Sequence, residues 1–179
     1  MALDRNRTDT LMQKGQELAN DTLFSDILYD ISRTSRLKSE RDYIQHGVTS
    51  CLLHSIAVAY YSDRLALRFN NVFCNRRALI RGALLHDYFL YDWHISDPSH
   101  RLHGFKHPKT ALSNAKTDFS ISPIEEDIIK KHMFPLTPAI PKYREAYLVS
   151  AVDKALSVYE IFSSQPYQKS RVKDYLDNI

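Results

Sequence analysis

Residues 83–87 read Ala-Leu-Leu-His-Asp, so an adjacent histidine and aspartate lie near the end of an apolar segment. Apolar residues recur along this segment at helical spacing, which predicts a helix over residues 74–91. An unpaired carboxylate in a protein core costs several kcal/mol, so Asp87 needs a partner, and a metal ion is one such partner. Taken alone, the pair is equally consistent with a satisfied core histidine, His86, beside a surface aspartate.

Two other apolar segments carry the same kind of residue. His54 lies in residues 52–59, Leu-Leu-His-Ser-Ile-Ala-Val-Ala, and Asp153 lies in residues 149–155, Val-Ser-Ala-Val-Asp-Lys-Ala. Helical bundles build metal sites from side chains on facing helices. The sequence therefore predicts a metal site that is shared by three core-facing helices. Its expected ligands are His54, His86, Asp87 and Asp153.

Length and composition favour a single all-α domain. The chain has 179 residues, which fits one domain over residues 1–179 and allows a sizeable buried core. Four glycines are too few for a tight-turned β-sandwich or barrel. Residues 1–8 are polar and are expected to fray. We therefore expect a helical bundle whose ordered part begins after this polar start.

Helical periodicity and turn residues predict the elements on both sides of the expected ligands. Ser122 is expected to cap a helix, with Pro123 at its first position and Glu125 completing a capping box. Pro108 is expected in the first turn of another helix. Residues 32–39 are expected to form a loop or an exposed helix end, and irregular segments are expected at residues 91–108 and 134–141. The expected helices cover residues 11–19, 23–31, 41–69, 74–91, 108–116, 123–133 and 142–162, with a short one after residue 167.

Charge and cysteine content bound the class of protein. The net charge of +3 permits an anionic substrate and does not point to a specific nucleic-acid partner. Cys51 and Cys74 lie in apolar helical segments and are expected to be buried free thiols. Residues 1–9 do not resemble a signal peptide, and no run approaches the roughly 20 apolar residues of a membrane span. We therefore expect a cytoplasmic protein without a membrane partner, and the sequence leaves open whether it forms a homodimer.

The ordered set of expected ligands resembles the HD-domain superfamily of metal-dependent phosphohydrolases. In that superfamily a histidine, an adjacent His-Asp pair and a distant aspartate lie on separate helices. The matching positions are His54, His86 with Asp87, and Asp153, and the likeness spans about residues 46–159. The resemblance implies a single-domain helical bundle of the HD type. It also implies a metal-dependent phosphohydrolase that acts on a nucleotide or another small phosphate ester or anhydride.

Two further histidines extend the likeness. His107 precedes Pro108, and His132 follows the helical residues 128–131. In dinuclear members of the superfamily, histidines at these two places bind a second metal, an arrangement similar to that of the hydrolases that split diadenosine tetraphosphate symmetrically. The resemblance implies that Asp87 bridges the two ions. From the residues alone, His107 could be a loop histidine and His132 a helix C-terminal cap.

The resemblance implies a cofactor of one or two divalent transition-metal ions. Nitrogen-rich sites with carboxylates suit iron, manganese, zinc, cobalt or nickel better than magnesium or calcium. Likeness to the superfamily favours iron or manganese, and the residues do not choose between them. His103 could replace His107 as a ligand, and His46 is expected either to support the site or to lie on the surface.

The chain departs from the superfamily directly after the His-Asp pair. Many members carry Ile-Gly-Lys or a glutamate there, whereas residues 88–90 of this chain are Tyr-Phe-Leu. Asp92 and His94 are the nearest residues that could replace that glutamate as a general acid and protonate the leaving oxygen. Together with Asp87, they are the candidate catalytic residues. Both could equally be surface residues. The chain lacks the Gly-Tyr-Pro signature of the branch that degrades cyclic di-GMP, which disfavours that substrate.

The expected reaction uses a water whose pKa is lowered by a bound metal toward neutral pH. Lys154 and Lys109 are candidate contacts to a phosphate, although a solvated surface charge is the commoner role of a lysine. Trp93 could stack on a nucleobase. Two other functions stay open: a di-iron oxygenase of the HD type, and a non-catalytic metal-containing module that binds or senses a ligand.

Overall fold

The structure, a computed structural model, describes residues 2–33, 35–69, 74–95 and 102–179. Within these ranges the chain forms eight α-helices, one short 3-10 helix and one two-stranded antiparallel sheet, which confirms the all-α fold class. In chain order the elements are α1 (Ala2–Ser32), α2 (Ser35–Lys38), η1 (Ser39–Arg41), β1 (Ile44–His46), β2 (Thr49–Ser50), α3 (Cys51–Arg68), α4 (Arg76–Leu84), α5 (His103–Asp118), α6 (Pro123–Lys131), α7 (Arg144–Phe162) and α8 (Arg171–Asp177).

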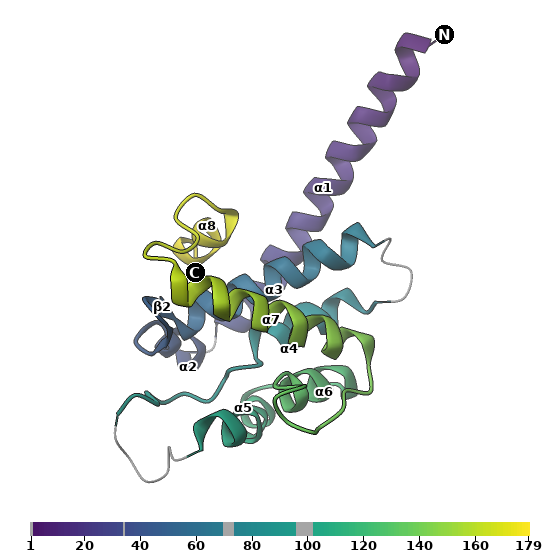
Figure 1. Cartoon of the computed structure of the whole chain (residues 1–179). Coiled ribbons are helices and arrows are strands. Elements are labelled where there is room, and N and C mark those ends of the chain that lie inside the picture. Colours follow the sequence, from purple (N-terminus) through teal and green to yellow (C-terminus); the bar gives the residue numbers. More distant parts are fainter. Residues whose placement is uncertain (1, 34, 70–73, 96–101) are drawn as a thin grey trace.

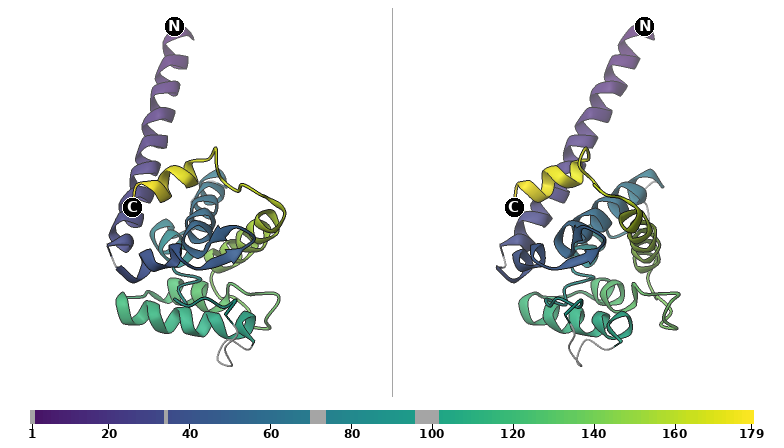
Figure 2. Two further views of the ribbon diagram at one scale, coloured as in Figure 1. Left: turned by 90° about the vertical axis from the view of Figure 1, so that its left-hand side faces the viewer. Right: turned by 60° about the vertical axis from the view of Figure 1, so that its left-hand side comes forward.

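Helices α3, α4, α6 and α7 form the centre of the molecule. Helix α3 packs against α4, α7 and α8, and α6 packs against α4, α5 and α7. Figures 1 and 2 show α5 and α6 together as one layer below α3, while the N-terminal part of α1 extends beyond the rest of the chain. Among the described residues, no helix combines the length and the apolar character that crossing a bilayer requires.

Helix α3 carries its ligand candidate into the interior. Ser50 begins the helix as its N-cap, because its side chain accepts a hydrogen bond from the backbone N–H of Leu53 at 3.3 Å. Leu52 and Ile56 are fully buried on α3, and burial of such a side chain contributes about 1.5–3 kcal/mol. His54 lies between them in sequence and is also fully buried, so the helix places an imidazole in the core.

Residues 44–50, expected within the helix over 41–69, form the β1–β2 hairpin instead. Gly47 makes the turn with a φ of 56°, a left-handed conformation that glycine adopts without steric cost. The turn lies directly against α7, because a Cβ on Gly47 would lie only 2.8 Å from the backbone carbonyl oxygen of Glu160. This close approach holds β1 against α7, and α3 therefore begins only at Cys51.

Helix α4 ends at Leu84 and excludes His86 and Asp87, which the periodicity places on the helix. Leu85 leaves the helical conformation, with φ −107° and ψ 3°. The Nδ1 atom of His86 lies 2.7 Å from the backbone carbonyl oxygen of Ala83, so the ring N–H takes one of the last free carbonyls of the helix. The histidine and the aspartate consequently lie in the turn after α4, where they can face several helices.

Three other predicted boundaries differ from the structure. The predicted helices over 11–19 and 23–31 are a single helix α1, which also takes in residues 2–8. The hydroxyls of Thr22 and Ser25 donate to helix carbonyls at 2.9 and 2.8 Å, so the polar junction stays helical. Helix α2 occupies part of residues 32–39, for which a loop or an exposed helix end is predicted. Helix α5 starts before Pro108, which lies inside the helix at the loss of one backbone hydrogen bond.

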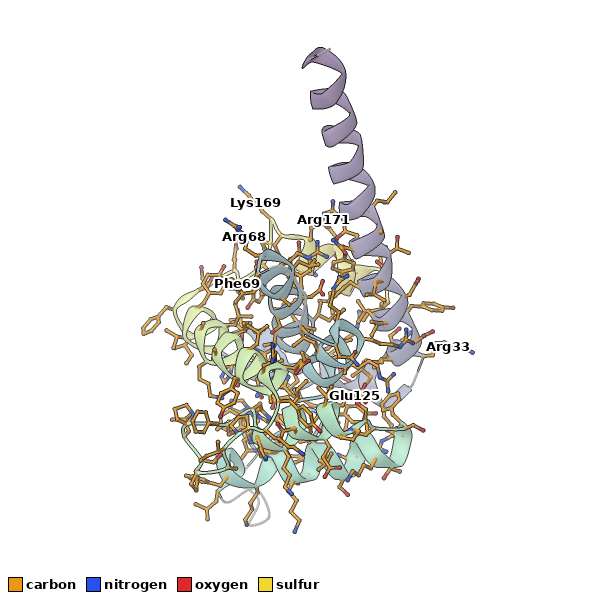
Figure 3. The ribbon with its side chains drawn as sticks, turned by 90° about the vertical axis from the view of Figure 1, so that its right-hand side faces the viewer. Arg33, Arg68, Phe69, Glu125, Lys169 and Arg171 are labelled. Carbon is orange, nitrogen blue, oxygen red and sulfur yellow. The ribbon has the colours of Figure 1, made fainter. Side chains whose placement is uncertain are left out.

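The predicted start of α6 is confirmed. Ser122 accepts a hydrogen bond from the Glu125 backbone N–H, and the Glu125 carboxylate accepts one from the Ser122 backbone N–H at 2.6 Å. Glu125, labelled in Figure 3, also pairs with the Arg81 guanidinium of α4 at 2.5 Å. Both cysteines are free thiols, as predicted; Cys51 is buried as expected, whereas Cys74 is only half-buried.

Gly82 lets α4 and α6 approach closely. A Cβ at this position would lie 2.6 Å from Cδ1 and 3.1 Å from Cβ of Ile128, which no relaxed side chain tolerates. The close approach brings the C-terminal ends of the two helices together. His86 follows the end of α4, and His132 is the C-cap residue of α6. The positions of both histidines therefore depend on the contact between Gly82 and Ile128.

We predict that Gly82→Ala destabilises the protein by about 1–3 kcal/mol, because the added methyl group overpacks the contact with Ile128. Urea unfolding of the metal-free protein measures the change in the free energy of unfolding. Gly104→Ala is the matched control, since a Cβ at Gly104 meets no atom within 4 Å. Equal stability of the two variants would show that the α4–α6 contact is not close.

Candidate metal centre

Five segments bring six imidazole and carboxylate side chains to one place. They come from α3, the turn after α4, α5, the end of α6 and α7. Each of the six is at most 6% exposed, so they form a cluster inside the fold rather than a surface patch. These residues are His54, His86, Asp87, His107, His132 and Asp153, the six ligands expected from the sequence.

The first group of the cluster consists of His54, His86 and Asp153. One ligand atom of each lies within 4.8 Å of the others. The Oδ1 atom of Asp153 is 3.2 Å from Nε2 of His54 and 3.8 Å from Nε2 of His86. The arrangement offers two nitrogens and one oxygen to a common point, a donor set that suits divalent transition metals.

The second group consists of Asp87, His107 and His132. The Oδ1 atom of Asp87 lies 3.2 Å from Nε2 of His107 and 3.5 Å from Nε2 of His132. The two Nε2 atoms are 2.8 Å apart. This group also places two nitrogens and one oxygen around one point, on the side of Asp87 that faces α5 and α6.

Asp87 is a member of the second group and also faces the first. While Oδ1 faces the second group, Oδ2 lies 3.4 Å from Nε2 of His86 and 3.9 Å from Nε2 of His54. One carboxylate therefore presents one oxygen to each group. A carboxylate in this position can hold two cations side by side.

Backbone carbonyls orient three of the four histidine rings. The Nδ1 atoms of His86, His107 and His132 lie 2.7, 3.0 and 2.9 Å from the carbonyl oxygens of residues 83, 103 and 129. A carbonyl only accepts, so each Nδ1 donates its proton to a carbonyl and Nε2 is the nitrogen of each ring that faces the cluster. This is the arrangement in which histidine binds a metal through Nε2.

A carboxylate orients the fourth ring. The Nδ1 atom of His54 lies 2.8 Å from Oε2 of Glu160, which is fully buried on α7. The hydroxyl of Tyr167 donates to Oε1 of the same carboxylate at 2.6 Å. Such a carboxylate fixes the ring and raises the basicity of the opposite nitrogen. Glu160 is absent from the ligands predicted above, although it lies seven residues after Asp153 and therefore on the same face of α7.

Two polar atoms in the cluster have no hydrogen-bond partner among the described residues. They are Nε2 of His86 and Oδ1 of Asp87, and both are buried. A buried polar atom without a partner costs about 1–3 kcal/mol, and more when it is charged. Both atoms point into the groups described above, where a cation would satisfy them. The buried histidines and aspartates can therefore hold a metal ion.

The aspartates are held in the charged form. Burial opposes ionisation of Asp87, but the imidazoles of His86, His107 and His132 outweigh it, and the pKa of Asp87 lies well below its usual range. Burial acts in the same way on Asp153, and the imidazoles of His54 and His86 lower its pKa well below the usual range. Both carboxylates are consequently charged at neutral pH, as ligands must be.

The histidines divide into two classes. Burial disfavours the charged form of His54, but the carboxylates of Glu160 and Asp153 raise its pKa well above the usual value. Burial likewise opposes the charge on His86, and Asp87 and Asp153 raise its pKa. Burial, together with the neighbouring imidazoles, lowers the pKa of His132 to about 3. Without a metal, His54 carries a proton at neutral pH, whereas His132 offers a free lone pair.

A cavity of about 620 Å³ opens onto the cluster. Asp87, His107, His132 and Asp153 line its floor. Of the residues predicted to bind substrate, Trp93 and Lys154 line the cavity. The ammonium group of Lys154 donates to Oδ2 of Asp153 at 2.9 Å and to the backbone carbonyl of His132.

Three other predicted site residues lie away from the cavity. Lys109 is exposed on α5 and does not line it. Asp92 and His94 pair with each other, with Oδ1 3.2 Å from Nδ1, and the His94 ring is exposed. Neither belongs to the lining, so the structure does not bring these two residues to the cavity. Part of the predicted loop around them, residues 96–101, lies outside the described ranges.

His103, the alternative to His107, and His46 both line the cavity. His103 lines it but belongs to neither group, and its Nδ1 faces the Tyr91 hydroxyl at 2.8 Å. His46 is half-buried on β1, with its ring edge-on to that of His54 at 5.2 Å. His107 is therefore the better placed ligand on α5, and His46 lies beside the cluster.

Gln45 and Glu40 are two further residues that the motifs did not indicate. Gln45 on β1 donates from Nε2 to Oδ2 of Asp87 at 2.5 Å and accepts from Nε1 of Trp93 at 3.3 Å. Glu40 is fully buried in η1, and both of its carboxylate oxygens lack a hydrogen-bond partner among the described residues. Burial and the charge of Asp87 raise its pKa well above the usual range. No local motif marks either residue, since their roles arise from the hairpin and η1.

Comparison of this chain with family models, with curated proteins and with solved structures gives no match. The chemistry of the centre therefore rests on its own geometry.

We predict that metal binding releases protons and strengthens as pH rises. The raised pKa of His54 means that the metal-free protein holds a proton there, which a bound cation must displace. Titration calorimetry with Mn²⁺ at pH 6 and pH 8, in buffers of different ionisation enthalpy, measures the affinity and the number of protons released. His94→Gln, which alters an exposed ring, should preserve the release. An affinity independent of pH would contradict the placement of His54.

We predict that Glu40→Gln relieves a pH-dependent loss of stability. The folded-state pKa of Glu40 is raised, so stability is highest below the usual carboxyl pKa and falls as pH rises through the folded-state value. Glutamine stays neutral, so its advantage over the parent protein should grow from pH 5 to pH 8 in urea unfolding without metal. Asp26→Asn, at an exposed position, is the control whose effect should not change with pH. A pH-independent difference for Glu40→Gln would show that Glu40 is charged.

Proposed function

We propose that this chain is a metal-dependent phosphohydrolase of the HD type that holds two divalent transition-metal ions, with iron or manganese favoured. The observation that carries the proposal is the division of the Asp87 carboxylate between two buried groups, each with two Nε2 atoms. The ordered ligands resemble those of the HD-domain superfamily, and their convergence supports the same assignment. The buried position of the groups, at the floor of an open cavity, suits a resident cofactor.

The residues of the chain have distinct parts in this reaction. When bound, two divalent metal ions supply positive charge for a phosphoryl group and a water whose pKa is lowered toward neutrality. Asp87 fixes the spacing between the two positions, and Glu160 holds the ring of His54 in place. Lys154, beside Asp153 on the cavity floor, offers an ammonium group to an anionic oxygen of the substrate.

The cavity supports a small phosphate-containing substrate, such as a nucleotide or another phosphate ester or anhydride. Its volume of about 620 Å³ lies within the range of about 300–1,000 Å³ that is usual for small-molecule sites. Asp92 and His94 pair with each other at the surface, so we do not assign either as the general acid. Solvent water that enters the open cavity can protonate the leaving oxygen.

We predict that protein loaded with Mn²⁺ or Fe²⁺ hydrolyses members of a panel of phosphate monoesters, dinucleoside polyphosphates and diesters. Asp87→Asn removes the shared charge and should lower kcat/KM by at least about 100-fold. Asp174→Asn, at an exposed position on α8, is the matched control and should keep full activity. Phosphate release is the measurement, and metal content is determined for each protein used.

Three outcomes separate the candidate functions. Phosphate release that depends on Asp87 supports the hydrolase. Oxygen consumption with an oxidised product, and no phosphate release, would instead identify a di-iron oxygenase. Retained ligand binding without any turnover, in both the parent protein and Asp87→Asn, would identify a binding or sensing module and overturn the proposal.

A further inference from the structure

The walls of the cavity differ sharply from its floor. The floor consists of the imidazoles and carboxylates of the metal centre, whereas Met133, Leu136 and Val158 form one aliphatic wall, and Gln45, His46 and Ser157 also line the cavity. Leu136 and Val158 are 65% and 57% exposed, so both offer apolar surface that a bound molecule can cover. Burial of such surface against a ligand is favourable at about 25 cal/mol per Å². The walls therefore favour an apolar part of the bound molecule.

A column of rings stiffens another wall. The His103 ring stacks on His107 at 4.7 Å and 19°, and the Trp93 ring is nearly parallel to His103 at 5.1 Å and 10°. Trp93 is held from the side by its hydrogen bond to Gln45. The column reaches from a ligand of the second group to the half-buried Trp93. It gives the cavity a rigid aromatic wall before any ligand enters, which lowers the entropic cost of binding.

Positive charge is scarce on the walls. Among the described lining residues, Lys154 is the one lysine or arginine, and its ammonium group already contacts Asp153. Two divalent ions, the carboxylates of Asp87, Asp153 and Glu160, and Lys154 sum to a net charge of about +2, which falls to about +1 once the water that attacks the phosphate has lost its proton. A phosphate monoester carries about −1.5 to −2 at neutral pH. One monoester balances this charge, whereas a chain of several phosphates would leave anionic oxygens facing aliphatic groups.

We propose, on the basis of the function proposed above, that the substrate is a phosphate monoester whose organic group is uncharged and largely apolar. The phosphate lies on the floor beside Lys154, and the organic group lies between the aromatic column and the aliphatic wall formed by Met133, Leu136 and Val158. Dinucleoside polyphosphates fit this cavity less well, although the ligand pattern resembles that of enzymes that split them. The reaction transfers the phosphoryl group to water, breaks the P–O bond to the alcohol and returns a proton to the alkoxide.

Matched probes test the substrate class. The compounds 3-phenylpropyl phosphate and glycerol 3-phosphate both release a primary alcohol, so a difference in kcat/KM between them reports chiefly on how the organic group is bound. We expect the phenylpropyl ester to be favoured by at least about 10-fold. Thymidine 5′-monophosphate tests whether a nucleoside supplies the apolar group, and a dinucleoside tetraphosphate tests the polyphosphate alternative. Two results would overturn the inference. One is a kcat/KM for 3-phenylpropyl phosphate and for thymidine 5′-monophosphate that equals the value for glycerol 3-phosphate. The other is a higher kcat/KM for the tetraphosphate.

A pair of variants tests the aliphatic wall directly. Leu136→Ser removes apolar surface from the cavity and should lower the preference for the phenylpropyl ester by about 3- to 10-fold. Ile140→Ser is the matched control, since Ile140 is also 65% exposed and does not line the cavity. Its preference should match that of the parent protein. Equal preferences in the two variants would show that this wall does not contact the organic group.

Binding without turnover separates failure of the inference from failure of the proposed function. Trp93 is the single tryptophan of the chain and lines the cavity, so its fluorescence reports on ligand entry. The metal-loaded protein should bind 3-phenylpropylphosphonate at least about 10-fold more tightly than 2-hydroxyethylphosphonate. Such binding without hydrolysis of any ester would support the ligand class and contradict the hydrolase. Hydrolysis together with equal binding of the two phosphonates would support the hydrolase and contradict the proposed ligand class.

Discussion

The structure depends on one carboxylate that is shared between two groups of imidazoles. Asp87 is 2% exposed, and its two oxygens face opposite sides of a cluster drawn from five segments of the chain. Burial of a charged group costs several kcal/mol unless partners surround it. Here the partners are imidazoles whose other nitrogens are fixed by backbone carbonyls or by Glu160. Without a cation, burying these charged and polar groups lowers the stability of the fold. With cations bound, the same groups are satisfied.

The fold provides this arrangement through early helix endings and close contacts. Helix α4 ends just before His86, so that the following turn can present two ligands to different neighbours. Gly82 lets α6 approach α4, which places His132 opposite Asp87. Gly47 lets the β1–β2 hairpin lie against α7 near Glu160. These features bring the ligands together, while the aliphatic core around α3 supplies the stability that offsets their burial.

The all-α class and the positions of His54, His86, Asp87 and Asp153 leave local signals in the sequence, whereas His107 and His132 are expected only from the resemblance to the HD-domain superfamily. Polar residues inside apolar helical segments, such as His54 and Asp153, stand out from periodicity alone. The hairpin over residues 44–50 leaves no such signal, because its turn depends on a tertiary contact between Gly47 and α7. For the same reason Gln45 could not be found from a motif. Glu160 could have been found, since its spacing from Asp153 places both on one face of α7.

The most direct test of the shared carboxylate is a count of bound metal. Protein loaded with Mn²⁺ and freed of excess ions by gel filtration is analysed for metal per chain by mass spectrometry. If Asp87 joins two groups that each hold a cation, the parent protein retains two ions per chain, and Asp87→Ala retains at most one. A parent protein that retains no metal, or a variant that keeps both ions, would contradict the account.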